Sequence, residues 1–337
     1  MFRARYAQAI EIYTELLKLD PASAHRWSNL GEALLASGDQ QRAEYCYLRA
    51  IALAPKMAQI LLDLTDFFIA IEQPAKALPY GQRLLAGVPD GSQDAVLFPL
   101  YHSAKLSPAV ILEQGIPALD RPRRAYFSYL LSEGLVDEAR EAWGRVGDER
   151  LLIPYVHFLA GKGRMIEAAQ VWLAGASKLD PDYPLSNRVF NGGFERELGE
   201  SPFEWTVKPE AGVKVARAQE SENWSLQIEF EGKQNVDYHH VSQLVYLEPG
   251  QYRLAARAKA EKLTTEQGVG LAFAGAATNM VSGTTGWTTL EAVGDAGGLV
   301  EVRVIRRPSK RFENKIKGTV WIDSVKLTRL GGSAIRQ

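Results

Sequence analysis

The chain has 337 residues, 46% of them hydrophobic and 23% charged, which is enough for two domains with cores of their own. Its 39 basic and 40 acidic residues give a net charge of −1, which excludes the strongly basic surface that nucleic acid or an anionic membrane would attract. No apolar run approaches the roughly 20 residues of a membrane-spanning helix, and the start lacks a signal-peptide pattern, so the sequence predicts no membrane span in this chain.

Three prolines, Pro21, Pro55 and Pro89, recur at steps of 34 residues, a period typical of helix-pair repeats. Residues 24–57 carry the clearest copy, whose spaced positions are Trp27, Leu30, Gly31, Leu34, Gly38, Ala43, Tyr47, Ala50 and Pro55. This pattern resembles the tetratricopeptide repeat. The spacing predicts two antiparallel helices joined at Gly38, and because one pair cannot bury both its faces, neighbouring pairs must stack. Cys46, the single cysteine, excludes an internal disulfide and should be a buried, inert thiol on the second helix.

Weaker copies flank this one. Residues 58–90 complete the strong repeats at 24–90, and only the second helix of a repeat remains at the front, with Ala9 and Tyr13 before Pro21. We expect the chain to be a fragment or to have a misassigned start, with a further helix or a membrane anchor upstream of Met1. Degenerate repeats follow at 125–180, and four prolines predict a short or irregular helix pair over 94–122. The helical repeat domain is thus predicted over 1–180.

The resemblance to tetratricopeptide repeats implies a peptide groove lined by the first helix of each pair. The positions that should project into it are His25, Ser28, Glu32 and Leu35 from one copy and Gln59, Leu62, Asp66 and Ile69 from the next. This set mixes apolar and acidic side chains and lacks the Lys/Asn pattern that clamps a C-terminal carboxylate. A basic or apolar segment of a protein partner would suit them, and the alternative is a scaffold without a bound peptide.

Composition changes near Lys178, where two prolines, two asparagines and two glycines predict a linker at 181–190. Beyond it, apolar and polar residues alternate, as in Leu226, Ile228 and Phe230, which is typical of half-buried strands. Several such strands with glycine-rich turns predict a β-sandwich over 191–330, followed by a tail at 331–337.

Three motifs of this second part occur in order: residues 191–195 (NGGFE), residues 242–254 (SQLVYLEPGQYRL) and residues 318–327 (GTVWIDSVKL). Together they resemble the galactose-binding-like jelly roll of carbohydrate-binding modules, over 187–330. The predicted fold class is therefore multidomain, α then β: an α-solenoid of helix-pair repeats followed by a β-sandwich jelly roll.

A cluster of polar side chains marks a possible sugar face. If Val245 and Leu247 face the core, counting back by two places Val241 and His239 with them, and Tyr238 and His240 on the other face. The next strand should bury Tyr252, Leu254, Ala256 and Ala258 and expose Arg253 and Arg257. Tyr238, His240, Arg253 and Arg257 are thus expected on one carbohydrate-binding face, with Trp224 as a platform on a loop. The alternative for the four polar residues is an ordinary solvated strand face.

Trp205, Trp287 and Trp321 are assigned to the core.

The jelly-roll resemblance also implies a structural calcium ion. Glu195 and Asp323 occupy the positions of carboxylate ligands in related modules, Gly193 would supply a carbonyl, and such oxygen ligands suit a hard cation. Without calcium, these residues would be an exposed pair at the domain edge.

Catalytic signatures are absent from the sequence: it has no glycine-rich phosphate loop, no Cys/His metal spacing and no nucleophile elbow. We therefore expect no enzyme and no catalytic cofactor. A non-catalytic adaptor is the leading hypothesis, holding a protein partner through its repeats and a carbohydrate through its jelly roll, in bacterial envelope or exopolysaccharide assembly and exposed to the periplasm or cell surface. A purely protein–protein scaffold and, remotely, a lyase using Tyr238 or His240 or a hydrolase are the alternatives.

Overall fold

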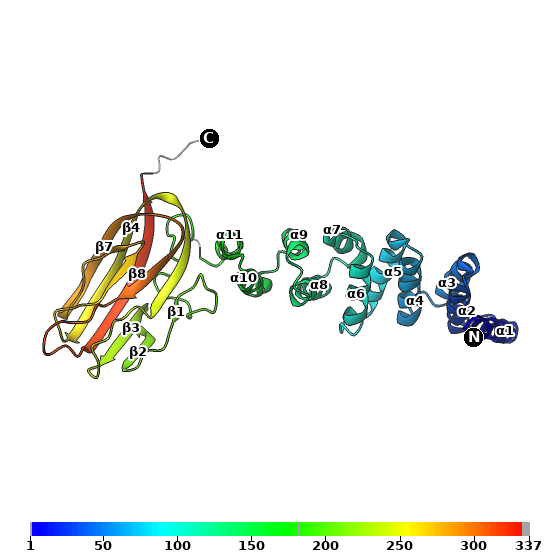
Figure 1. Ribbon diagram of the computed structural model, residues 1–337, viewed down its shortest axis with the longest axis horizontal. Helices are drawn as coiled ribbons and strands as arrows, with labels where there is room; N and C mark the ends of the chain where they lie inside the picture. The colour runs from blue at the N-terminus through cyan, green and yellow to red at the C-terminus, as the bar shows by residue number, and fades with distance from the viewer. Residues whose placement is uncertain (1, 181, 332–337) are drawn as a thin grey trace. The chain divides into compact units, whose positions relative to one another are not determined.

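The computed structural model describes residues 2–180 and 182–331, with side chains from Arg5 onward, so Pro181 of the predicted linker and residues 332–337 of the predicted tail lie outside the described residues. Helices precede an antiparallel β-structure along the chain (Figure 1), which confirms the predicted fold class. The chain divides into two compact units between Leu151 and Leu152, and each is described separately below. In the described part of the chain, no helix is both long enough and apolar enough to cross a bilayer.

The first unit consists of paired helices. In chain order they are α1 (Phe2–Leu19), α2 (Ala24–Ser37), α3 (Gln40–Leu53), α4 (Ala58–Ala70), α5 (Pro74–Gly87), α6 (Asp94–Ser103), α7 (Pro108–Val110), the π-helical turn η1 (Ile111–Gly115), α8 (Asp120–Ser132), α9 (Val136–Val146) and the 3₁₀ turn η2 (Glu149–Leu151). Gly38 ends α2 in the left-handed conformation at φ 94°, and the Asp39 side chain caps α3 by accepting from the Arg42 N–H. Gly31 lets the Tyr47 ring approach α2, since a Cβ there would lie 3.0 Å from that ring.

The segment predicted to be irregular is irregular. Pro99 lies inside the ten-residue α6, and α7 has only three residues before η1 widens the turn. Tyr101 of α6 packs between α5 and η1: its ring is fully buried, its hydroxyl donates to the Gly115 carbonyl at 2.9 Å, and Gly81 leaves room for it.

The second unit begins with a helix pair, α10 (Leu152–Gly161) and α11 (Met165–Ala176). Its strands are β1 (Thr206–Val207), β2 (Val213–Glu220), β3 (Asn223–Glu231), β4 (Val241–Leu263), β5 (Gly270–Phe273), β6 (Ala276–Ala277), β7 (Gly283–Ile305) and β8 (Lys317–Leu330). The indole of Trp172 on α11 packs against Phe190 and Phe203, with ring centroids 5.2 and 6.4 Å away. The last helix pair is therefore packed on the strand-bearing segment; the domain boundaries proposed from the sequence stay predictions.

Two long strands, β4 and β7, organise the jelly roll. They pair with each other along nearly their whole length, with a register shift between Leu247 and Gly250. Beyond this shift, β8 pairs with residues 251–261 of β4 and carries β3 and β2, whereas β1 and β5 pair with the other halves of β4 and β7. These two sets of strands enclose one apolar core.

The register shift also changes which residues of β4 face the core. Before it, the odd-numbered Val241, Val245 and Leu247 are buried, and after it the even-numbered residues are, as predicted: Tyr252, Leu254, Ala256 and Ala258. One extra residue at the bend reverses the alternation, as a β-bulge does.

Candidate functional sites

The predicted groove residues lie on α2 and α4, which are in contact. His25, Glu32, Gln59 and Asp66 are exposed, and the three apolar members, Leu35, Leu62 and Ile69, are half-buried. Ser28 is the exception: it is 3% exposed, and its hydroxyl donates to an Asp63 carboxylate oxygen at 2.5 Å. The prediction that Ser28 projects into a groove is wrong, because this small side chain is used to join α2 to α4.

Acidic side chains dominate the electrostatics of this α2–α4 surface. Asp63 accepts from the Gln59 amide at 2.7 Å as well as from Ser28. Burial raises the pKa of the Asp66 carboxyl, and the neighbouring Asp63 raises it further. Burial is likewise the main cause of the raised pKa of Tyr47, followed by the charges of Asp63, Glu32 and Asp66. A cation brought to this surface would relieve the repulsion among these acids.

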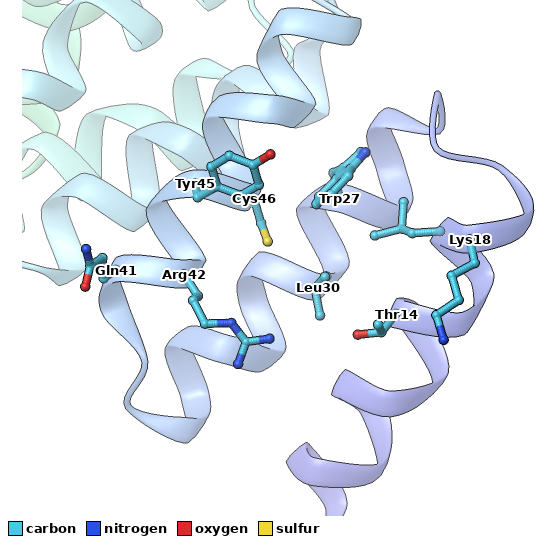
Figure 2. Close-up of a pocket in the computed structure, with 9 residues that line it drawn as sticks. Thr14, Lys18, Trp27, Leu30, Gln41, Arg42, Tyr45 and Cys46 are labelled. Atoms are coloured by element: carbon cyan, nitrogen blue, oxygen red, sulfur yellow. The ribbon is translucent and has the colours of Figure 1, made fainter.

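A hollow that the sequence did not predict lies among α1, α2 and α3 (Figure 2). Leu17, Leu30 and Cys46 form its apolar part. Lys18 and Arg42, which are exposed, line it as well and pair with Glu15 at 2.5 Å and Asp39 at 3.5 Å. Cys46 is buried, as predicted, and burial raises the pKa of its thiol to about 11, which makes it unreactive.

Tyr238 does not lie on an exposed face. Its side chain is 1% exposed and packs in the core against Phe230, with ring centroids 5.6 Å apart. Its backbone bridges to Arg306, and β4 begins only at Val241. His239 and His240 therefore lie outside a strand between two core positions, and the alternation shifts by one. The predicted outward Tyr238 and inward His239 are both wrong; His239 is exposed.

His240 is half-buried, and its Nε2 lies 3.0 Å from a carboxylate oxygen of Glu210. Burial raises the pKa of Tyr238, and the Glu210 charge adds to this effect. Since Arg253 and Arg257 lie beyond the bend of β4, the four residues expected on one face are not brought together.

Arg253 and Arg257 are exposed on β4, as predicted. Of the three tryptophans assigned to the core, Trp205 is buried at 1% exposure, whereas Trp287 and Trp321 are half-buried on the outer face. Their assignment was wrong because core residues lie at the alternate positions. Val320 and Ile322 flank Trp321 and point inward, and Trp287 lies three residues before the core residue Leu290, on the opposite face of β7.

Trp224 lies on β3 rather than on a loop. It is half-buried, and the guanidinium carbon of Arg217 lies 4.0 Å from its ring centroid, so the arginine covers one ring face. Arg217 also donates to the carbonyls of Phe194 and Glu195 at 2.8 and 2.9 Å. These contacts tie the opening motif of the jelly roll to β2.

The residues expected to bind calcium converge. A Cβ placed on Gly193 would lie 3.9 Å from an Asp323 carboxylate oxygen and 3.7 Å from Cγ of Glu195. Asp323 is 5% exposed and accepts from the Asn223 amide at 3.1 Å and from the Ser324 N–H. Among the described residues, no group of three or more His, Cys, Asp or Glu side chains could hold a metal ion, so a cation here would need backbone carbonyls in addition to these two acids.

Comparison with known proteins agrees with this architecture. Residues 24–57 match the family model of the tetratricopeptide repeat, and no curated protein matches the chain. TmCBM61, solved in complex with β-1,4-galactotriose, is 21% identical over 43% of this chain and 99% of its own, with a TM-score of 0.29. The CBM22-1 xylan-binding domain of Paenibacillus barcinonensis Xyn10C is 14% identical over 42% of this chain and 94% of its own, with a TM-score of 0.29. The TPR2B domain of yeast Sti1 is 24% identical over 30% of this chain and 84% of its own, with a TM-score of 0.29. The family model confirms the predicted tetratricopeptide repeat at residues 24–57, and the strands that enclose one apolar core confirm the β-sandwich predicted after the helices.

Proposed function

We propose that the protein is a non-catalytic adaptor whose helical repeats bind a segment of a protein partner and whose jelly roll binds a carbohydrate. The observation that carries this proposal is that one chain joins a tetratricopeptide repeat to a jelly roll whose β4 strand exposes Arg253 and Arg257. A role in envelope or exopolysaccharide assembly would use both activities.

The α2–α4 surface favours a basic partner segment. Glu32 and Asp66 are exposed there, and Asp63 stands beside them, while Leu35 and Leu62 offer apolar contact. A lysine or arginine of the partner would lower the electrostatic cost that raises the pKa of Asp66. Apolar residues of the same segment would bury the exposed parts of the leucines.

The proposed sugar-binding residues on the outer face are Arg253 and Arg257, which are exposed on β4. Trp224 instead has the parity of the core residues Leu226 and Ile228 of β3, and Arg217 lies against its ring. Guanidinium groups present several N–H donors in a fixed plane, which suits sugar hydroxyls and carboxylates. Tyr238 and His240 are not part of this surface, because one is in the core and the other is paired with Glu210.

A structural calcium ion held by Glu195, Asp323 and the Gly193 carbonyl is part of the proposal. Asp323 is a buried carboxylate whose hydrogen-bond donors, the Asn223 amide and the Ser324 N–H, are neutral. Glu195 lies close to it, so a divalent cation there would compensate two negative charges. The ion would fix the opening motif to β8 and play no chemical role.

One observation favours the alternative of a protein–protein scaffold with a structural jelly roll. Trp172 of α11 is 1% exposed and packs on Phe190 and Phe203, so the jelly roll buries the last helix pair. Covering the last helix pair would then be the function of the jelly roll, which would need no sugar ligand.

Two binding measurements on the full chain test the proposal. A glycan array, run with and without calcium, should show binding that the Arg253→Ala/Arg257→Ala double variant loses and the Lys310→Ala/Lys315→Ala control keeps. A basic peptide library should bind, and Glu32→Gln/Asp66→Asn should weaken that binding. Peptide binding without any glycan binding would favour the scaffold, and turnover of a polysaccharide would refute the non-catalytic assignment.

A further inference from the structure

Two tryptophans of the jelly roll share the outer face of the sheet formed by β2, β3, β8, the second half of β4 and the first half of β7. Trp321 on β8 lies directly opposite Lys259 of β4, and Trp287 lies on β7, on the other side of β4. The Lys259 ammonium is 4.5 Å from the Trp321 ring centroid and 5.3 Å from that of Trp287. The two indoles and the lysine therefore form one continuous surface, here called the tryptophan platform.

The spacing of the platform follows from the strand order. Trp321 and Trp287 are on strands that flank β4, and neighbouring strands lie about 4.8 Å apart, so the two indoles stand roughly 10 Å from each other across the sheet. Two rings at that separation can contact different sugar residues of one chain. A single monosaccharide cannot cover both.

Polar neighbours distinguish the platform from an ordinary apolar patch. Gln227 lies opposite Trp321 on β3, and Thr289 lies opposite Arg257 on β7. Lysine is depleted at the centre of protein–protein interfaces, whereas Lys259 lies between these two indoles. Half-buried aromatic rings among amide, hydroxyl and guanidinium groups match a sugar, which has an apolar C–H face and hydroxyls at its edge.

Charge indicates which sugars fit. The Lys259 ammonium is held by the Glu220 carboxylate, whereas no carboxylate of the described residues lies within ion-pair distance of Arg257, whose guanidinium carbon is 5.4 Å from the Trp287 centroid. On β7 the nearest acid of this face is Glu291, two residues beyond the strand partner of Arg257. On β8 the strand partner of Arg257 is Asp323, which is 5% exposed and accepts from the Asn223 amide. Arg257 is thus a cation beside an aromatic ring with room for an external carboxylate.

We propose that the tryptophan platform binds an acidic polysaccharide, with sugar rings stacked on Trp321 and Trp287 and a sugar carboxylate paired with Arg257. Lys259 stands between the two indoles, and its charge is compensated by Glu220. This inference rests on the proposed carbohydrate function and deepens it, since it adds Trp287, Lys259 and Trp321 to the site and names the ligand class.

The test measures binding of the full chain to polygalacturonate, alginate and hyaluronate, with fully methyl-esterified polygalacturonate and xylan as neutral comparisons. The variants are Trp287→Ala, Trp321→Ala and Arg257→Ala. Phe312→Ala is the matched control, because Phe312 is a fully exposed aromatic residue of the same unit, away from the platform. Unchanged thermal unfolding identifies the variants that remain folded.

Each tryptophan variant should weaken binding of an acidic polymer by about tenfold, the usual consequence of truncating an aromatic anchor. Arg257→Ala should remove the preference for the acidic over the esterified polymer, and Phe312→Ala should change nothing. Glycan binding that is indifferent to both tryptophans, or equal affinity for acidic and neutral polymers, would overturn this inference while leaving the carbohydrate function intact. Failure to bind any glycan would refute both.

Discussion

Replacing Trp172 by alanine tests whether α10 and α11 fold as part of the jelly-roll unit. Trp172 is 1% exposed, and its indole contacts Phe190 and Phe203 of the segment that precedes β1. Removing a buried tryptophan costs about 3–5 kcal/mol, because transfer energy is lost and a cavity remains. In a unit of this size that loss corresponds to a fall in melting temperature of roughly 6–20 °C.

Trp143 supplies the matched comparison, since it occupies the same repeat position one pair earlier. It is half-buried and belongs to the first unit, so Trp143→Ala should cost less and should spare the jelly roll. Hydrogen exchange read by mass spectrometry would follow both units in one sample. In Trp172→Ala, faster exchange should appear in α10, α11 and the β-strands together. Faster exchange confined to α10 and α11 would refute the view that this helix pair and the strands form one cooperative unit.

Three further predictions concern single carboxylates. Asp39 caps α3, because its Oδ1 accepts from the Arg42 N–H at 3.1 Å. Asp39→Ala should therefore lower the unfolding free energy by about 1 kcal/mol in urea titrations. An unchanged free energy would mean that solvent replaces the cap. Asp66→Asn should stabilise the first unit at neutral pH and weaken the binding of basic peptides. The folded-state pKa of Asp66 is raised, so its charge destabilises the fold above that pKa, and this cost disappears as the pH falls through it. The melting temperatures of the variant and the wild type, measured against pH, should therefore converge in acid. Asp323→Asn should abolish a calcium-dependent rise in melting temperature that the exposed control Glu222→Gln retains; an equal rise in both would place calcium elsewhere.

The helical part was predictable because its signals are local. A proline every 34 residues ends each pair, and small residues such as Gly31 and Ala43 mark where helices approach. Even the irregular stretch after Asp94 was evident from its prolines. In contrast, the hollow beside Leu30 and Cys46 was missed, because residues assigned to helix packing gave no sign that packing is incomplete between α1 and α3.

The jelly roll shows where counting along a strand fails. Alternation placed Tyr252 and Leu254 in the core correctly, since they lie on an uninterrupted part of β4. It failed for Tyr238, because the residues at 239 and 240 are outside the strand and shift the phase by one. Trp287 and Trp321 were assigned by hydrophobicity instead of by alternation. Had the core positions Val320 and Ile322 been counted, Trp321 would have been placed on the outer face.

Although the net charge of the chain is −1, it carries one acidic and one basic surface. Glu32 and Asp66 are exposed on α2 and α4, while Arg253 and Arg257 are exposed on β4. At physiological ionic strength, exposed charges act over about 8 Å, so a ligand at either surface responds to the local charge and not to the sum over the chain. The near-zero total therefore excludes a large uniform field, but it permits the helical repeats to select a cationic peptide and the sheet to select an anionic sugar. Raising the salt concentration should weaken both interactions, and the part of sugar binding that survives is the contribution of the indole rings.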